Sequence, residues 1–482
     1  MTSADQLRLA SEFDPATREQ WQALVEKVLR RSGTEVDGRP EDLLATETYD
    51  GFSLQPLYTS DDRAPDAGFP GVSPFTRGTR PDGTVAEGWD VRQRHEHPDP
   101  AVTRQAVLTD LENGVTSLWL VIGAAGLPLD SLADVLSEVY LDLAPVTLDA
   151  GADFAAAARA LLDLHDDKGV QASEVRGNLG ADPIGLRART GQAQDLDGAV
   201  ELAVSVAGRY AGLRSVVVDA LPYHGAGSSD GQELGYALAT AVAYLRALTD
   251  GGLSVDDAAW QLEFRYAATA DQFGTIAKLR AARRLWARVA EVVGTGTAVP
   301  QHAVTSTTMM TRRDPWVNML RTTLACFAAG VGGADAVTVQ PFDTAIGLPD
   351  AFARRIARNT QSILMEESRV AGVIDPAGGS WYVERHTDEL AHAGWAVFQE
   401  VERAGGIVAA LDSGLVDERI AAVRDARTRR LDGGEEVITG VTVFPDRNEK
   451  PLTREPAPPL PHGGLPRVRY AEPFEAALEG ES

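Results

Sequence analysis

The sequence predicts an α/β protein built as a (β/α)8 barrel, and two observations lead to this prediction. Short apolar segments alternate with longer amphipathic ones in strand–helix units of about 35–45 residues, the repeat of a parallel barrel. No G-x-G-x-x-G turn follows the first strand, which gives a dinucleotide-binding open sheet little support. With 482 residues, 44% of them hydrophobic, the chain is large enough for one such barrel and additional segments.

We expect three regions: an N-terminal helix with an extended arm (residues 1–88), the barrel (residues 89–430) and a proline-rich, linker-like tail (residues 431–482). In the first region, Asp14-Pro15 predicts a helix start and Ser32-Gly33 predicts its end. The apolar face of this helix consists of Phe13, Trp21, Leu24, Val25, Val28 and Leu29. Such an apolar leading helix is expected to pack on the barrel or on another chain, and we predict a subunit interface. Residues 49–88 predict an irregular arm.

Strands and helices are then expected in alternation. Apolar or alternating runs predict strands at residues 117–123, 145–151, 171–176, 214–224, 297–304 and 337–342. Helical periodicity predicts helices at residues 132–141, 154–164, 234–248, 276–293 and 352–364. A loop with Asp343 precedes the last of these helices, and a Gly-rich turn leads to a further strand-like piece at residues 373–384. The loops after the strands form the working face of such a barrel, so they are expected to carry the site.

Composition excludes several classes of function. The sequence contains no run of about 18 apolar residues, so no transmembrane helix is predicted. The first residues lack the pattern of a secretory signal. The net charge of −25 argues against a nucleic-acid partner. Cys326 is the single cysteine, which excludes an internal disulfide, and it is expected to be a small buried hydrophobe. A cytoplasmic location is therefore expected.

Four segments carry a family resemblance: Y-D-G-F-S-L-Q-P-L-Y-T (49–59), G-V-S-P-F-T-R-G (71–78), K-L-R-A-A-R-R-L-W (278–286) and I-A-R-N-T-Q (356–361). In this order they resemble the acyl-CoA mutase family, the adenosylcobalamin-dependent enzymes that include methylmalonyl-CoA mutase. The resemblance extends from about residue 49 to about residue 445. It implies a barrel that binds an acyl-CoA and, in catalytic members, a following domain that binds cobalamin.

The resemblance implies a cobalt-ligating histidine in a D-x-H-x-x-G motif, and this sequence lacks a full match. The nearest segment is Asp163-Leu164-His165, where Lys168 stands in place of the glycine and the position falls inside the barrel region. We interpret it as a coincidence and predict no cofactor-binding residue on this chain. His95-Glu96-His97 offers two alternating histidines, but a solvated turn is expected there and no metal site.

The substrate pocket also departs from the family pattern. Catalytic members carry a tyrosine after an Arg-Gln pair that closes over the radical chemistry, and Arg94 takes that place here. A permanently charged guanidinium is a poor substitute for a phenol in a site that excludes water. In the carboxylate-binding region this chain has Gly180-Ala181-Asp182. The nearby Arg187 and Arg189 are expected to be surface arginines on a helix.

Two residues match family positions that contact the substrate. His224 matches the histidine that hydrogen-bonds the thioester carbonyl, so it is a vestigial catalytic candidate, with a structural histidine as the alternative. Arg280 matches a phosphate-contacting arginine, with an ordinary helix charge as the alternative. In the CoA-binding run, Gln301, Ala303 and Thr305 replace an arginine, a histidine and a glutamine, which predicts weak CoA binding.

The resemblance therefore implies the small, non-catalytic subunit of a heterodimeric methylmalonyl-CoA mutase. The expected partner is the large subunit, which binds adenosylcobalamin and most of the acyl-CoA and isomerises methylmalonyl-CoA and succinyl-CoA in propionate metabolism. No cobalamin-binding domain is expected in this chain. The alternative is the catalytic barrel of a split acyl-CoA mutase whose cobalamin domain is a separate chain. The altered loops at residues 91–96 and 301–308 favour the subunit.

Overall fold

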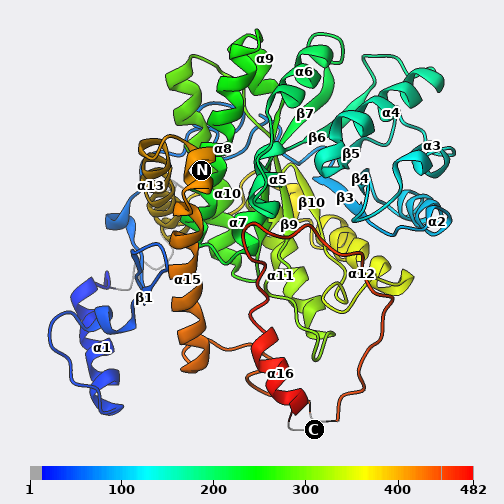
Figure 1. Ribbon diagram of the computed structural model, residues 1–482. Coiled ribbons are helices and arrows are strands. Elements are labelled where there is room, and N and C mark those ends of the chain that lie inside the picture. Colours follow the sequence, from blue (N-terminus) through cyan, green and yellow to red (C-terminus); the bar gives the residue numbers. More distant parts are fainter. Residues whose placement is uncertain (1–13, 447, 481–482) are drawn as a thin grey trace, which may run out of the picture.

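A closed barrel of eight parallel strands forms the centre of the molecule, in the spatial order β10-β3-β4-β5-β6-β7-β8-β9 (Figure 1). The computed structural model describes residues 14–446 and 448–480. The barrel strands are β3 (Asp90–His95), β4 (Ser117–Val121), β5 (Val146–Asp149), β6 (Arg176–Ala181), β7 (Gly212–Asp219), β8 (Leu262–Ala268), β9 (Gln301–Thr305) and β10 (Ala336–Thr338). Pairing of β10 with β3 closes the ring, which confirms the predicted (β/α)8 barrel.

Helices surround the barrel and follow its strands along the chain. They are α2 (Pro100–Leu111), α3 (Leu132–Val135), α4 (Phe154–Asp167), α5 (Pro183–Thr190), α6 (Asp197–Val206), α7 (Leu221–Gly225), α8 (Asp230–Asp250), α9 (Val255–Trp260), α10 (Gln272–Val293), α11 (Val317–Val331) and α12 (Ala351–Ser362). Three more, α13 (Trp381–Arg403), α14 (Ile407–Asp412) and α15 (Leu415–Asp432), follow the last strand, and α13 packs along α8 and α10.

Side chains along each strand point alternately toward the surrounding helices, where the hydrophobic core lies, and into the barrel interior. In β4 every side chain is buried, and Leu118 and Leu120 belong to the core that the helices cover. Successive side chains of a strand point to opposite faces, so Ser117 and Trp119 face the interior. The Ser117 hydroxyl confirms this direction, because the Nε atom of Arg92, on the neighbouring β3, donates to it at 3.2 Å.

Large polar and aromatic side chains contact one another across the barrel interior. Arg92 of β3 forms an ion pair with Glu263 of β8 at 2.6 Å. The rings of Trp119 on β4 and His302 on β9 lie 5.4 Å apart, and the Arg265 guanidinium of β8 lies 4.1 Å from the centre of the Trp119 ring. None of these strand pairs are neighbours in the barrel, so the contacts run through its middle. Side chains from opposite strands therefore fill the barrel interior at this level.

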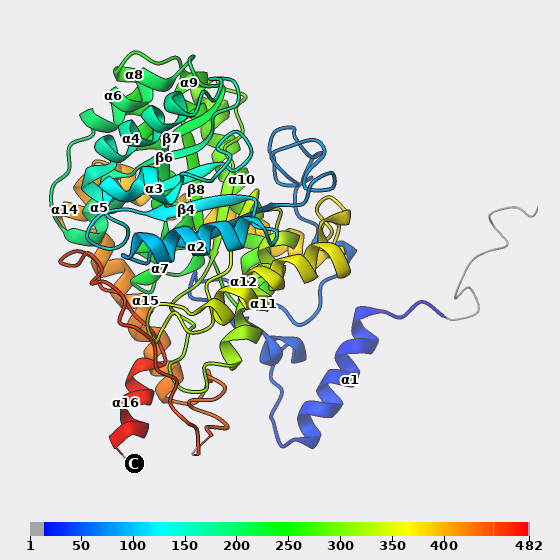
Figure 2. The same ribbon diagram turned by 90° about the vertical axis from the view of Figure 1, so that its right-hand side faces the viewer.

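The N-terminal helix α1 (Arg18–Arg31) stands away from the barrel (Figure 2). It begins after Thr17, whose hydroxyl accepts from the backbone N–H of Gln20, three residues later than predicted. None of its residues is buried, and Leu24 and Val28 are 63% and 65% exposed. Phe13, predicted on the same face, lies outside the described residues. An antiparallel pair, β1 (Thr46–Glu47) and β2 (Ser53–Leu54), then starts the arm.

The tail crosses the C-terminal rim of the barrel before ending in α16 (Glu472–Gly480). We call residues 465–470 the strap, because their backbone N–H groups are bonded to three separate rim segments. Leu465 donates to the carbonyl of Ala188 and Val468 to that of Gly225, both at 2.8 Å, and Tyr470 donates to that of Thr308 at 3.2 Å. The tail is therefore attached to the barrel. The domain boundaries at residues 88 and 430 remain predictions.

Several predicted elements are wrong in type or position. The strand-like piece at residues 373–384 consists of turns and the start of α13, because Ser380 caps the helix and Val383 packs on a neighbouring helix. The strand predicted at residues 171–176 starts only at Arg176 and continues to Ala181, where a loop was expected. The helix predicted at residues 132–141 ends at Val135. The sequence analysis did not identify β3 or β8, and residues 91–95, which it treated as part of a loop, lie in β3.

Candidate functional site

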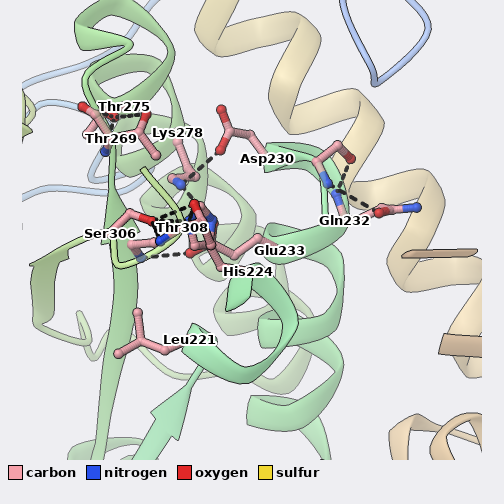
Figure 3. A network of polar contacts seen from close by, with 12 residues as sticks. Leu221, His224, Asp230, Gln232, Glu233, Thr269, Thr275, Lys278, Ser306 and Thr308 are labelled. Atoms are coloured by element: carbon pink, nitrogen blue, oxygen red, sulfur yellow. Dashed lines mark hydrogen bonds and ion pairs between the residues drawn. The ribbon is translucent and has the colours of Figure 1, made fainter. Parts of the chain in front are cut away.

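The first candidate residue, His224, lies at the C-terminal end of the barrel between two polar side chains from distant parts of the chain (Figure 3). It is on α7, directly after β7, and is 7% exposed. Its Nε2 atom lies 2.7 Å from the hydroxyl of Ser306, in the loop after β9. Its Nδ1 atom lies 3.2 Å from the carboxylate of Glu233 on α8. Serine, imidazole and carboxylate therefore form a continuous row.

Lys278 of α10 holds the carboxylate in place. Its ammonium is 2.7 Å from Glu233 and 2.8 Å from Asp230, and the other Glu233 oxygen accepts from the backbone N–H of Ala267 at 2.8 Å. Burial acts to raise the pKa of Glu233, but Lys278 and His224 outweigh it and hold that pKa below its ordinary value. His224 Nδ1 is at ion-pair distance from this carboxylate but makes no hydrogen bond to it or to any other described residue. The negative charge of Glu233 favours a proton on Nδ1, the tautomer in which Nε2 can accept.

Sequence reasoning did not identify Glu233, Lys278 or Ser306. The three residues come from α8, α10 and the loop after β9. Lys278 and Ser306 lie in segments that carry the family resemblance, but neither was singled out within them. Only their position at one end of a closed barrel brings them together. The short spacing between His224 and Glu233, with a capped helix start at Ser229 between them, is the single local signal that the sequence contains.

Charged groups at the mouth of the barrel pair with one another. Asp219, at the end of β7, accepts from both Arg189 and Arg265, the latter at 3.2 Å. Arg189 also lies 3.9 Å from Asp149 at the end of β5. Burial acts to raise the pKa of Asp149, but Arg189 and other arginines outweigh it and lower that pKa. Arg187 and Arg189 both lie on α5, as predicted, but their side chains are only 14% and 16% exposed, and each forms an ion pair, Arg187 with the exposed Asp412. Neither is therefore a freely solvated surface arginine.

Arg280, the candidate phosphate contact, is completely buried in a network of its own. Its guanidinium pairs with Asp375 and with Glu384 at 2.6 Å, and its Nε atom lies 3.4 Å from the Thr387 hydroxyl. The network also includes Arg77 of the arm, 3.0 Å from Asp375. Protein groups thus surround the Arg280 guanidinium, and none of these contacts connects it with the His224 row. Arg280 as a substrate-binding residue stays a prediction.

The three substituted positions of the CoA-binding run are buried and face protein partners. The Gln301 amide oxygen accepts from Arg283 at 2.7 Å, and its NH2 donates to the carbonyl of Leu279 at 3.1 Å. The Thr305 hydroxyl accepts from the backbone N–H of Gln340 at 2.7 Å. Ala303 is completely buried. Groups already engaged in this way are not free to bind a ligand.

Arg94 and its neighbours are also engaged within the fold. The Arg94 guanidinium pairs with Glu96 and lies 5.1 Å from the centre of the Trp119 ring. His95, expected in a solvated turn, is 2% exposed at the end of β3, and Arg354 of α12 donates to its Nδ1 atom at 3.0 Å. Burial and the Arg354 charge lower the pKa of His95 well below its ordinary range. The solvated-turn prediction is therefore wrong for this residue.

His165 is not placed to ligate the cobalt of a cobalamin. His165, the nearest match to a cobalt ligand, is 1% exposed on α4, and its Nδ1 atom lies 2.8 Å from the carbonyl of Leu161. A buried ring of this kind has no free face for a corrin. No group of three or more His, Cys, Asp or Glu side chains within residues 14–446 and 448–480 is arranged to hold a metal ion. No described helix is long and apolar enough to span a bilayer.

Comparisons with known proteins identify the family of this chain. A family model described as methylmalonyl-CoA mutase matches residues 47–124 and 119–459. The chain is 63% identical, over 99% of its length and 78% of the relative's, to a methylmalonyl-CoA mutase small subunit of Streptomyces virginiae. It is 47% identical to a probable small subunit of Mycobacterium bovis (95% of this chain, 75% of that protein). It is 41% identical to the small subunit of Propionibacterium freudenreichii subsp. shermanii (98% and 76%).

Matches of this length and identity define the class of protein. The chain belongs to the methylmalonyl-CoA mutase family. The relatives named above are small subunits of that enzyme, which confirms the resemblance stated from the sequence.

Proposed function

We propose that this chain is the non-catalytic small subunit of an adenosylcobalamin-dependent methylmalonyl-CoA mutase and that it stabilises the catalytic large subunit. The observation that carries the proposal is the filled barrel interior, where Arg92–Glu263 and the group of Trp119, His302 and Arg265 contact across the barrel. Barrel enzymes bind substrate at the C-terminal mouth, in a cavity with a few free polar groups. Here Asp219 pairs with Arg189 and Arg265, and Arg94 pairs with Glu96, although Arg265 Nη2, Arg94 Nε and Trp119 Nε1 have no hydrogen-bond partner among the described residues.

The partner follows from the same assignment. The large subunit binds adenosylcobalamin and most of the acyl-CoA, and the two chains form a cytoplasmic heterodimer that isomerises methylmalonyl-CoA and succinyl-CoA. Within the printed sequence no D-x-H-x-x-G motif is present, and His165 is enclosed in α4. The net charge of −25 is unfavourable for a nucleic-acid partner.

The test is co-expression of this chain with a large-subunit homologue, followed by purification through a tag on this chain. We expect both chains to co-purify with mutase activity and with a visible cobalamin spectrum. The isolated chain should show neither. Stoichiometric cobalamin on the isolated chain, or mutase turnover by it, would contradict the proposal and favour a split enzyme.

A further inference from the structure

We propose that Ser306, His224 and Glu233 form a nucleophilic serine site that accepts an acyl group from a small thioester or activated ester. This activity is distinct from the isomerisation and does not depend on the proposed subunit role. The inference rests on the order and spacing of the three side chains at the C-terminal rim of the barrel (Figure 3).

The distances between the three side chains favour one direction for each proton. The Glu233 carboxylate, 3.2 Å from His224 Nδ1, favours the tautomer with the proton on that nitrogen. His224 Nε2 is then an acceptor, and the Ser306 hydroxyl, 2.7 Å away, donates to it. A nucleophile bonded to a base that is oriented by a carboxylate is the arrangement that activates serine in acyl transfer.

Two groups of Thr308 lie within hydrogen-bond distance of the Ser306 oxygen. The backbone N–H of Thr308 donates to the Ser306 oxygen at 3.1 Å, and the Thr308 hydroxyl lies 2.9 Å from it. Donors directed at this oxygen stabilise the negative charge that develops as its proton leaves. The backbone N–H of Thr307 has no acceptor among the described residues, so it is available to an oxyanion.

The reaction balances without any other reagent than water. The Ser306 oxygen attacks the carbonyl carbon of the ester while His224 Nε2 takes the hydroxyl proton. The carbon–sulfur bond of a thioester then breaks, and the imidazolium returns the proton to the thiolate, which leaves an acyl-serine. Water, deprotonated by His224 Nε2, attacks the acyl carbon. The bond between this carbon and the Ser306 oxygen breaks, and the imidazolium returns its proton to that oxygen, which releases the acid and restores the serine.

Access to the site depends on the strap. Ser306 is 2% exposed, but the next residue, Thr307, is exposed, so the serine lies directly beneath the surface. The strap covers this position through the bond from Tyr470 to the Thr308 carbonyl and the bond from Val468 to the Gly225 carbonyl. The Tyr470 hydroxyl also accepts from Arg427 at 3.0 Å. Access to the serine therefore requires local opening of the strap, in which these contacts break.

A fluorophosphonate probe tests the proposal on the full chain, because it reacts with activated serines. Intact mass measurement and peptide mapping should show one adduct at Ser306, absent in Ser306→Ala. The matched control is Ser413→Ala, which removes an exposed serine after α14 and should label like the wild type. His224→Gln keeps a polar side chain but removes the base, and should slow labelling by at least about a hundredfold.

The strap and the acyl donor provide the second measurement. Val468→Pro removes one strap hydrogen bond and should increase the labelling rate, provided that circular dichroism shows a folded chain. Acetyl-CoA should transfer an acetyl group to Ser306 or release free CoA, seen with a thiol reagent. If Ser306 carries no adduct in either the wild type or the folded strap variant, the proposal is overturned. If the strap variant does not fold, the result for the wild type alone decides. Labelling that survives His224→Gln overturns the role of the base.

Discussion

Asp182 is a buried carboxyl whose environment favours the protonated form. It lies at the N-terminus of α5, where one oxygen accepts from the Tyr244 hydroxyl at 2.7 Å and from the backbone N–H of Gly185 at 2.9 Å. The other oxygen is buried without a hydrogen bond to the described residues. Burial raises the pKa of Asp182 to about 7, although Arg189 opposes this shift.

This pKa predicts how stability depends on pH. Between about pH 4, the ordinary pKa of an Asp, and pH 7, the native chain binds more protons than the unfolded chain. The free energy of unfolding therefore decreases as pH rises through this range and levels off above pH 7. Asp182→Asn keeps the accepting oxygen and removes the titration, so it should be more stable than the wild type at pH 8, by at most about 4 kcal/mol.

Urea denaturation of both chains at pH 5 and pH 8 measures this difference. Asp142→Asn, which changes an exposed aspartate, is the matched control and should leave the pH dependence unaltered. An Asp182→Asn chain that is equally destabilised at both pH values would show that the carboxyl is ionised in the native state.

Cys326 is expected to be unreactive in the folded chain. It is completely buried on α11, and burial raises the pKa of its thiol well above the ordinary value. The thiolate is the reactive form, so a thiol reagent should titrate no group in the native chain and one group after denaturation. Rapid native titration would mean that α11 opens locally. The sequence analysis predicted this burial, which the structure confirms.

Sequence reasoning did not predict which arginines pair with carboxylates within the fold. Apolar neighbours were enough to place Cys326, but Arg189 and Arg280 have partners from distant segments, Asp219 for the first and Asp375 for the second. A helix charge in a sequence looks the same whether it faces water or a carboxylate. Only the closure of the barrel and the course of the loop before α13 decide between them.

At the scale of elements, α1 is a helix without a single buried residue. It is held to the arm by polar contacts such as Arg18–Asp62 at 2.9 Å. Its exposed Leu24 and Val28 lie one turn apart on one face, as the sequence predicted. Obligate interfaces bury large apolar areas, so this face is the expected contact with the large subunit.

Two substitutions test this interface while α1 itself is kept in the chain. Leu24→Asp combined with Val28→Asp should leave the isolated chain folded, because both side chains are exposed, and should reduce co-purification with the large subunit severalfold. Val292→Asp, at a 68% exposed position of α10, is the control. Deletion of residues 1–45 should have a larger effect. Full recovery of the partner with the truncated chain would contradict the interface.

The strands and helices were predictable where their periodicity was local. Runs such as residues 117–123 became β4, and the long amphipathic helices were correctly placed. Failures have identifiable causes. Gly177 and Gly180 both have positive φ angles in β6, so their residues do not resemble a strand. Trp381 and Val383 have strand propensity, but packing of α13 on α8 and α10 overrides it.

At the scale of the whole molecule, the filled barrel predicts weak binding of CoA esters. The three substitutions at Gln301, Ala303 and Thr305 each remove a polar contact worth about 1–3 kcal/mol. Affinity should therefore be at least roughly a hundredfold lower than that of a catalytic relative, since about 1.4 kcal/mol corresponds to a factor of ten. Calorimetry on the isolated chain measures it. Micromolar binding of a CoA ester would favour the split-enzyme alternative.

The strap also determines the order in which parts of the chain fold. Its bonds join the tail to rim segments near Ala188, Gly225 and Thr308, which are made much earlier during synthesis. Contacts between distant parts of a chain form late, because a long loop must first close. The nascent barrel thus has an uncovered rim until the tail has been made. During that interval the rim is open to other chains, so a partner that arrives early meets a surface that the finished protein covers.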